Sequence, residues 1–92
     1  MKDNFIFSKN AQKNLVKIEK KISTPNAISL FYNRLANNIC TILRENKLKH
    51  NVNHRANFRE KAIPEISLIE LTFSFRTENL LTTMEVHSIS VK

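Results

Sequence analysis

The sequence predicts an α+β domain with the element order β-α-α-(β)-β-β. Two observations predict it. Apolar residues recur every three or four positions through the first half of the chain, which is the period of helices with one buried face. In the last third they alternate with polar residues, which is the period of strands with one buried face. The 92 residues suffice for one core, so we expect a single domain over residues 1–92.

The chain begins with a short strand that runs into a helix. The run NFIFS (4–8) is apolar and too short for a helix. Ser8 is suited to cap the helix that follows, because its hydroxyl can accept a hydrogen bond from a first-turn amide. The apolar residues of this helix fall four, three and four positions apart in one stripe, Ala11, Leu15, Ile18 and Ile22.

A second helix is predicted from Asn26 to about Lys47. Thr24 is the expected N-cap, and Pro25 fits the first helical position, where its missing amide hydrogen is not needed. The apolar stripe of this helix is Ile28, Phe31, Leu35, Ile39 and Ile42. The short turn between the two helices predicts an αα-hairpin.

The last third predicts a β-hairpin. Within residues 68–76 the apolar residues Ile69, Leu71, Phe73 and Phe75 alternate with polar ones, and residues 80–91 are rich in Thr, Val and Ile. Asn79 lies between these runs and can adopt a left-handed turn conformation. The apolar phase shifts after Val86, so we expect a β-bulge near His87. A further short strand is predicted within residues 57–62.

Composition excludes several classes of protein. The chain has no glycine, which excludes the glycine-built phosphate loops of P-loop and dinucleotide-binding proteins. The one cysteine, Cys40, excludes an intramolecular disulfide and is expected to be a small buried side chain. No run approaches the roughly 18 apolar residues of a membrane span, and no signal peptide is recognisable. We therefore expect a cytoplasmic protein with no membrane association.

The positive charge is unevenly distributed. The net charge is +7, with thirteen Lys and Arg against four acids through Lys61 and two against four from Ala62 onward. Such asymmetry is typical of a domain that presents one basic face to a polyanion or an acidic protein. Lys13 and Lys17 on the first helix are candidates for that face. A solvated lysine-rich surface is the alternative interpretation.

Three segments resemble the RelE/ParE superfamily of toxin–antitoxin toxins. They are FIFSKNAQKNLVKIEKKI, AISLFYNRLANNICTIL and LIELTFSFRTENLLTTMEVHSI, and they cover most of the chain. The resemblance implies two helices packed on a small twisted antiparallel sheet. It also implies that the concave face of the sheet meets mRNA on the ribosome or DNA gyrase.

The resemblance also suggests site residues. Arg55, Arg59 and Lys61 match the cations that the family places before its central strands, and Arg76 and His87 match positions on the final hairpin. If the protein is an enzyme, the resemblance implies a metal-independent endoribonuclease with Arg55, Arg59 and His87 as catalytic residues and no cofactor. The sequence departs from RNA-cleaving members by having Glu70 in a strand that usually carries an arginine there, and by lacking an aromatic residue beside His87. Gyrase-directed members lack a full catalytic set.

The segment HNVNHRANFREKA (50–62) allows other interpretations. His54 and Phe58 lie among its cations and, with Lys61 and Arg76, are candidates for binding a nucleic acid or another target. Phe58 between two arginines is a candidate for stacking on a base. His50 and His54 are four residues apart, but no acid or cysteine stands at a recognised spacing, so we expect no metal site.

Two functions remain open from the sequence. The first is a RelE/ParE-like toxin that inhibits translation or gyrase and is neutralised by an antitoxin. The second is a non-enzymatic binding or inhibitor protein from a mobile element, which uses the same basic surface to occupy a nucleic-acid channel or an acidic groove of its partner.

Overall fold

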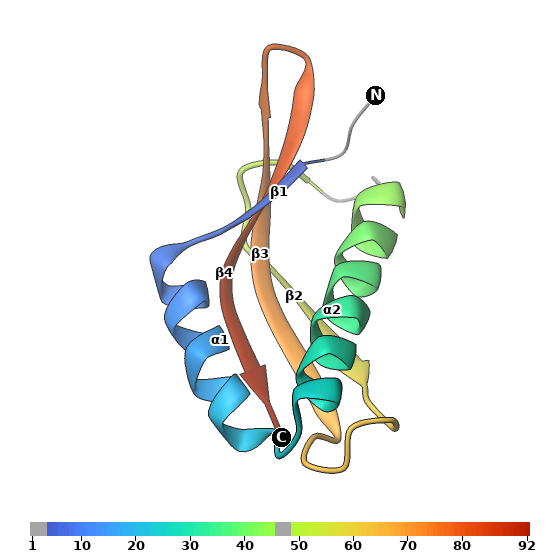
Figure 1. Cartoon of the computed structure of the whole chain (residues 1–92). Helices are drawn as coiled ribbons and strands as arrows, with labels where there is room; N and C mark the ends of the chain where they lie inside the picture. The colour runs from blue at the N-terminus through green and yellow to red at the C-terminus, as the bar shows by residue number, and fades with distance from the viewer. Residues whose placement is uncertain (1–3, 46–48) are drawn as a thin grey trace.

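The fold has the predicted order of elements, so the predicted α+β class is confirmed. The computed structural model describes residues 4–45 and 49–92. The elements are β1 (Asn4–Phe7), α1 (Lys9–Lys21), α2 (Pro25–Glu45), β2 (His54–Arg59), β3 (Leu68–Glu78) and β4 (Leu81–Val91). Both helices lie on one side of the sheet, and the β3–β4 hairpin extends beyond them (Figure 1).

The four strands form one mixed sheet in the order β1-β4-β3-β2. Strands β2, β3 and β4 are antiparallel neighbours, as expected, whereas β1 joins the edge of β4 in parallel. A parallel pair needs a long crossover connection, and here both helices and two strands lie between its two members. The strand expected within residues 57–62 begins earlier, at His54, and ends at Arg59, as the edge strand β2.

Both predicted helix starts are confirmed. Ser8 Oγ accepts from the Ala11 amide at 3.1 Å, and Thr24 Oγ1 accepts from the Ala27 amide at 3.1 Å. Pro25 is the first residue of α2. The predicted end of this helix at Lys47 lies outside the described residues. Neither helix has the length and apolar character needed to cross a membrane.

One apolar core fills the space between the helices and the sheet. The predicted stripe of α1 is buried, and so are the central residues of the α2 stripe. The inward side chains of β3 and β4 complete the core and are at most 2% exposed, namely Ile69, Leu71, Phe73, Phe75, Met84, Val86 and Ile89. Cys40 is only half-buried. Because one face of the sheet is committed to this core, the opposite face is left for polar side chains.

A buried carboxylate fixes the end of β2 to α2. The Glu60 side chain is 1% exposed, and its Oε2 accepts from Arg34 Nε of α2. Its Oε1 accepts from the amides of Lys61 and Ala62 at 3.0 and 3.1 Å. A buried charge is tolerated when it is paired and its oxygens are hydrogen-bonded, and both conditions are met here. This pair therefore holds the edge strand and the following loop against the helical layer.

A hydrogen bond joins the side chains of α1 and α2. The Tyr32 hydroxyl donates to Glu19 Oε2 at 2.8 Å. Burial, with this hydrogen bond and the adjacent negative charge, raises the pKa of Tyr32 from 10.0 to about 12. The native state therefore holds the phenol proton more tightly than the unfolded chain does. Its contribution to stability is complete below pH 10 and is lost as the pH rises towards 12.

The burial of Tyr32 and its hydrogen bond to Glu19 predict that the tyrosine ionises at an unusually high pH. Tyr32 is the only tyrosine in the chain, so tyrosinate absorbance reports its ionisation directly, and we expect a midpoint near pH 12. Glu19→Gln should lower the midpoint only in part, because burial is the larger cause and remains. Glu70→Gln, on the other face of the sheet, is the control and should leave it unchanged. A wild-type midpoint near 10 would contradict the described contact.

Candidate functional site

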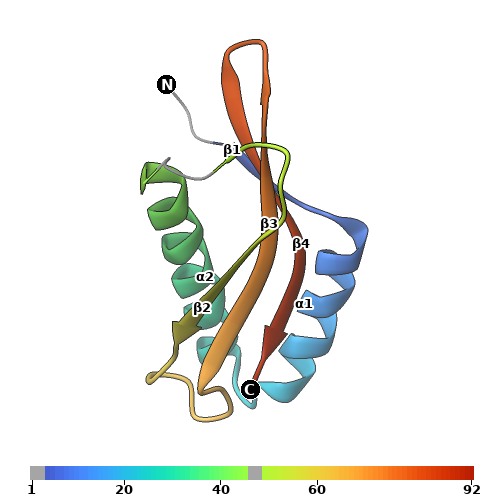
Figure 2. The same ribbon diagram turned by 180° about the vertical axis from the view of Figure 1, so that it is seen from behind.

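The sheet face turned away from the helices, which we call the outer face, is polar. Alternation along the strands separates it from the core, since successive side chains point to opposite faces. Figure 2 views the molecule from the side opposite to Figure 1, with β2 and β3 in front of α2. The outer face comprises Arg55, Asn57 and Arg59 of β2, Glu70, Thr72, Ser74 and Arg76 of β3, and Glu85, His87, Ser88 and Ser90 of β4.

A β-bulge presents His87 on this face. In the β3–β4 register Thr72 pairs with Ser88 and Phe73 pairs with Val86, so His87 is the extra residue, as the phase shift predicted. The bulged carbonyl of His87 accepts from Ser8 Oγ at 2.9 Å and from Asn10 Nδ2 at 3.1 Å. The beginning of α1 therefore holds the backbone of the bulge, and the imidazole is left on the outer side.

The same helix protects the edge of β4 beyond its pairing with β1. The β1 pairing ends at Val86, and Asn14 Oδ1 of α1 then accepts from the Ile89 amide at 3.0 Å. An unpaired strand edge exposes backbone donors and acceptors. Side chains of α1 therefore take the place of a neighbouring strand along this part of β4.

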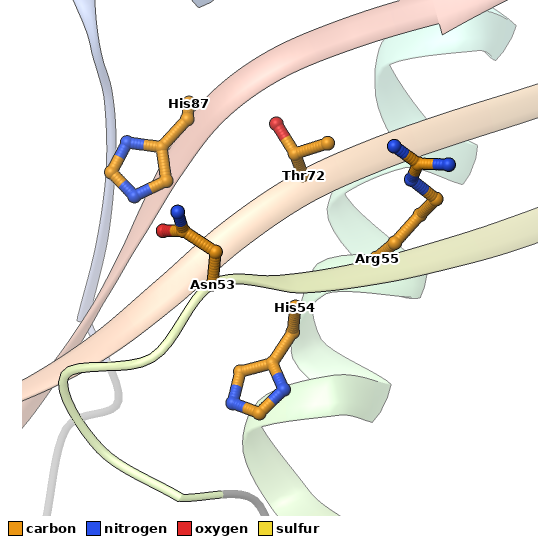
Figure 3. Close-up of a pocket in the computed structure, with 5 residues that line it drawn as sticks. All are labelled: Asn53, His54, Arg55, Thr72 and His87. Carbon is orange, nitrogen blue, oxygen red and sulfur yellow. The ribbon is translucent and has the colours of Figure 1, made fainter.

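An open hollow of about 540 Å³ lies at the centre of the candidate site. It is lined by Asn53, His54, Arg55, Thr72 and His87, which come from β2, the residue before it, β3 and β4. Figure 3 shows the side chains of Asn53, Thr72 and His87 near one another and the Arg55 guanidinium farther along the face. The His54 ring points the other way across β2 (Figure 3).

Glu70 organises one side of the hollow. Its Oε2 lies 3.9 Å from Arg55 Nε, and its Oε1 accepts from Ser90 Oγ at 3.4 Å. The Arg55 side chain is 70% exposed, and its separation from Glu70 exceeds hydrogen-bonding distance. Such an exposed pair is weak, so the planar guanidinium keeps donors for an external phosphate or carboxylate.

His87 is held by contacts on both sides of its ring. Its Nε2 lies 2.8 Å from Ser74 Oγ, and its Nδ1 lies 3.8 Å from Glu85 Oε2. Glu85 Oε1 also lies 3.8 Å from Arg76 Nη1. The His87 side chain is 35% exposed, so it is oriented by the protein and still accessible to a ligand.

The structure places four of the residues that the resemblance suggested on one face of the sheet. Arg55, Arg59, Arg76 and His87 all belong to the outer face. Lys61 is exposed in the loop just after β2.

Phe58 does not join these cations, so its expected position is corrected. It packs against the core, because it alternates with the exposed residues on either side of it in β2. The stacking role was expected from its place in the sequence between Arg55 and Arg59, whereas in β2 these two arginines point to the opposite face of the sheet.

The lysines of α1 form a separate basic surface. Lys13 and Lys17 are exposed on α1, in the helical layer, whereas Arg55 and Arg59 lie on the outer face of the sheet. The single basic face expected from the charge distribution is therefore divided between two layers. A ligand on the outer face does not need the α1 lysines.

The two histidines of the loop segment have structural contacts. His50 Nδ1 lies 2.9 Å from Thr77 Oγ1, and His54 Nε2 lies 2.8 Å from the Lys49 carbonyl. Both rings lie near Phe75, with centroid distances of 6.0 and 6.1 Å. Over residues 4–45 and 49–92, no group of three or more His, Cys, Asp or Glu side chains is arranged to hold a metal ion.

Sequence reasoning missed several residues of the hollow and its surroundings. Asn53 and Thr72 line it, Ser74 and Glu85 contact His87, and Glu70 contacts Arg55. The two-residue alternation of β3 contained a usable signal, because it puts Glu70, Thr72, Ser74 and Arg76 on one face. Pairing with β2 and β4 was needed to show which residues stand beside them.

Comparison with protein-family models, curated proteins and solved structures finds no match to this chain.

The bulge contact predicts a stability effect at Ser8. Ser8→Ala removes the N-cap of α1 and the hydroxyl that donates to His87, so the free energy of unfolding should fall by about 1 to 2 kcal/mol. Urea denaturation measures this change, and the imidazole NMR signals of His87 should move as well. Ser29→Ala, at an exposed position of α2, is the matched control and should change stability by less than about 0.5 kcal/mol. Equal effects of the two variants would contradict the proposed link between α1 and the bulge.

Proposed function

We propose that the protein is a RelE/ParE-like toxin that binds RNA on the outer face of its sheet and inhibits translation by cleaving mRNA on the ribosome. The observation that carries the proposal is that Arg55 and the oriented imidazole of His87 line the same hollow. The β-α-α-β-β-β order and the polar sheet face agree with the fold that the resemblance implied. The proposed site of action is the cytoplasm of a bacterial cell.

The chemistry of RNA cleavage fits these side chains. Attack of a 2′-hydroxyl on the adjacent phosphate needs a group that removes the hydroxyl proton, cations for the charged phosphorane, and a donor for the leaving oxygen. In this proposal His87 takes the proton of the attacking 2′-hydroxyl, a water molecule protonates the departing 5′-oxygen, and Glu85 and Ser74 orient the His87 ring. Arg55 binds the phosphate oxygens, and Arg59 binds a neighbouring phosphate along the strand.

A metal ion or an organic cofactor has no role in this proposal. The proposed partners are ribosome-bound mRNA and an antitoxin, an acidic protein segment that neutralises the toxin. The chain's net charge of +7 supports an acidic partner in general terms. The separate lysines of α1, including Lys13 and Lys17, offer such a partner a surface away from the RNA site.

A non-enzymatic binding or inhibitor protein is the second candidate. The presence of Glu70 and Glu85 on the outer face favours it, because these carboxylates already neutralise part of the positive charge around the hollow. The same surface would then occupy a partner's nucleic-acid channel or acidic groove, gyrase included, without cutting RNA. Binding driven by charge should weaken steeply as salt is raised.

Inducible expression in a bacterial host tests the toxin proposal. The wild type should arrest growth and produce cuts in ribosome-bound mRNA, while Arg55→Ala/Arg59→Ala should relieve the arrest at equal soluble protein levels. His87→Gln should lower cleavage by about 100-fold or more while leaving RNA binding nearly intact, because general acid–base catalysis typically contributes that much.

The matched control removes the same charge from the other basic surface. Lys13→Ala/Lys17→Ala also eliminates two cations, and it should leave the arrest intact. If only the α1 variant relieved the growth arrest, the target-binding surface would lie on the helical layer instead. Arrest with uncut mRNA and reduced DNA supercoiling would favour gyrase, and normal growth with abundant folded wild type would overturn the toxin proposal.

A further inference from the structure

The tip of the β3–β4 hairpin exposes an apolar side chain in an unfavourable backbone conformation. Glu78 pairs with Leu81, so Asn79 and Leu80 alone form the turn, with φ values of 50° and 65°. Two positive φ values suit the hairpin twist, and asparagine tolerates this region, whereas leucine does not. Leu80 is 89% exposed and Leu81 is 40% exposed. The contacts of the fold therefore give no reason for leucine at this position.

The hairpin carries this tip away from the rest of the molecule. The β2 pairing reaches only Phe73 of β3, and the described pairing of β1 with β4 starts at Thr83. Beyond these points β3 and β4 continue as a two-stranded ribbon, which projects past both helices (Figure 1). The tip is thus placed to reach another molecule.

The molecule also contains an apolar hollow of about 240 Å³. It lies between β1 and α2 and is lined by Phe5, Phe7, Tyr32, Leu35 and Ala36. Its lining is almost wholly hydrocarbon and aromatic, apart from the Tyr32 hydroxyl, which is already bonded to Glu19. Its volume exceeds the roughly 150 Å³ of an apolar cavity that can hold benzene, so an aliphatic side chain fits.

We propose that the chain self-associates, with the hairpin tip of each copy inserting Leu80 into the apolar hollow of a second copy. Each chain supplies one tip and one hollow, so a two-fold arrangement fills both and closes as a dimer. A second copy is favoured over an acidic partner because the tip and the hollow match in apolar character. An acidic segment would instead meet the lysines of α1.

Charge gives this contact a distinctive salt dependence. Two copies that each carry a net charge of +7 repel one another, and salt screens the repulsion. An apolar contact should therefore strengthen as salt is raised. This behaviour is opposite to that expected for a contact between a basic and an acidic surface.

Analytical ultracentrifugation across protein and salt concentrations tests the proposal. The wild type should show a monomer–dimer equilibrium that shifts towards dimer in higher salt, and Leu80→Asn should weaken association by about tenfold or more. The variant should be at least as stable to unfolding as the wild type, because asparagine accepts the turn conformation. Val16→Asn is the matched control, since it removes an exposed aliphatic side chain from α1 and should leave association unchanged.

A second variant tests the hollow itself. Ala36→Glu places a carboxylate in the hollow and should abolish self-association while the protein remains folded. An equimolar mixture of Leu80→Asn and Ala36→Glu should form a heterodimer, because one intact tip can still enter one intact hollow. A wild type that stays monomeric up to about 1 mM in high salt, or equal effects of Leu80→Asn and Val16→Asn, would overturn the proposal. These outcomes are independent of RNA cleavage.

Discussion

The β-bulge at His87 is the constraint on which the arrangement of this protein depends. An extra residue in β4 turns one carbonyl towards α1, where Ser8 and Asn10 donate to it, and leaves the imidazole on the outer face. Ser8 also caps α1, and its amide donates to the Val86 carbonyl at 3.0 Å. A single serine thus joins β1, α1 and β4. The same local irregularity links α1 to the sheet and places the His87 imidazole on the outer face.

Side chains alternate along the strands, so the two faces of the sheet have different compositions. The inner side chains of β3 and β4 are committed to the core, so only the outer face can assemble polar groups from three strands. A sheet face fixes side-chain spacing more rigidly than a loop does, which favours an oriented pair such as Arg55 and His87 over a diffuse basic patch. The α1 lysines lie in the other layer. The chain therefore has room for two different partners on two different surfaces.

The sequence predicted the elements better than it predicted the site. Long periodic stripes made both helices and the final hairpin recognisable, and the phase shift after Val86 located the bulge. Phe58 was misplaced because its stacking role was inferred from its sequence neighbours Arg55 and Arg59, which alternation in β2 puts on the opposite face. The contacts of His87 with Ser74 and Glu85 depend on strand register, which a single sequence does not specify. The parallel pairing of β1 was likewise not visible, because it joins residues nearly eighty positions apart.

The most direct test of the account is an NMR titration that locates bound RNA. A short single-stranded RNA with 2′-O-methyl groups resists cleavage, so it can be added to isotope-labelled protein while backbone and side-chain signals are followed. The account predicts that the largest changes fall on the outer face, at Thr72, the Arg55 guanidinium and the His87 imidazole. Signals of Lys13 and Lys17 should stay in place. Changes centred on α1, with the outer face unaffected, would contradict the assignment of the outer face as the functional surface.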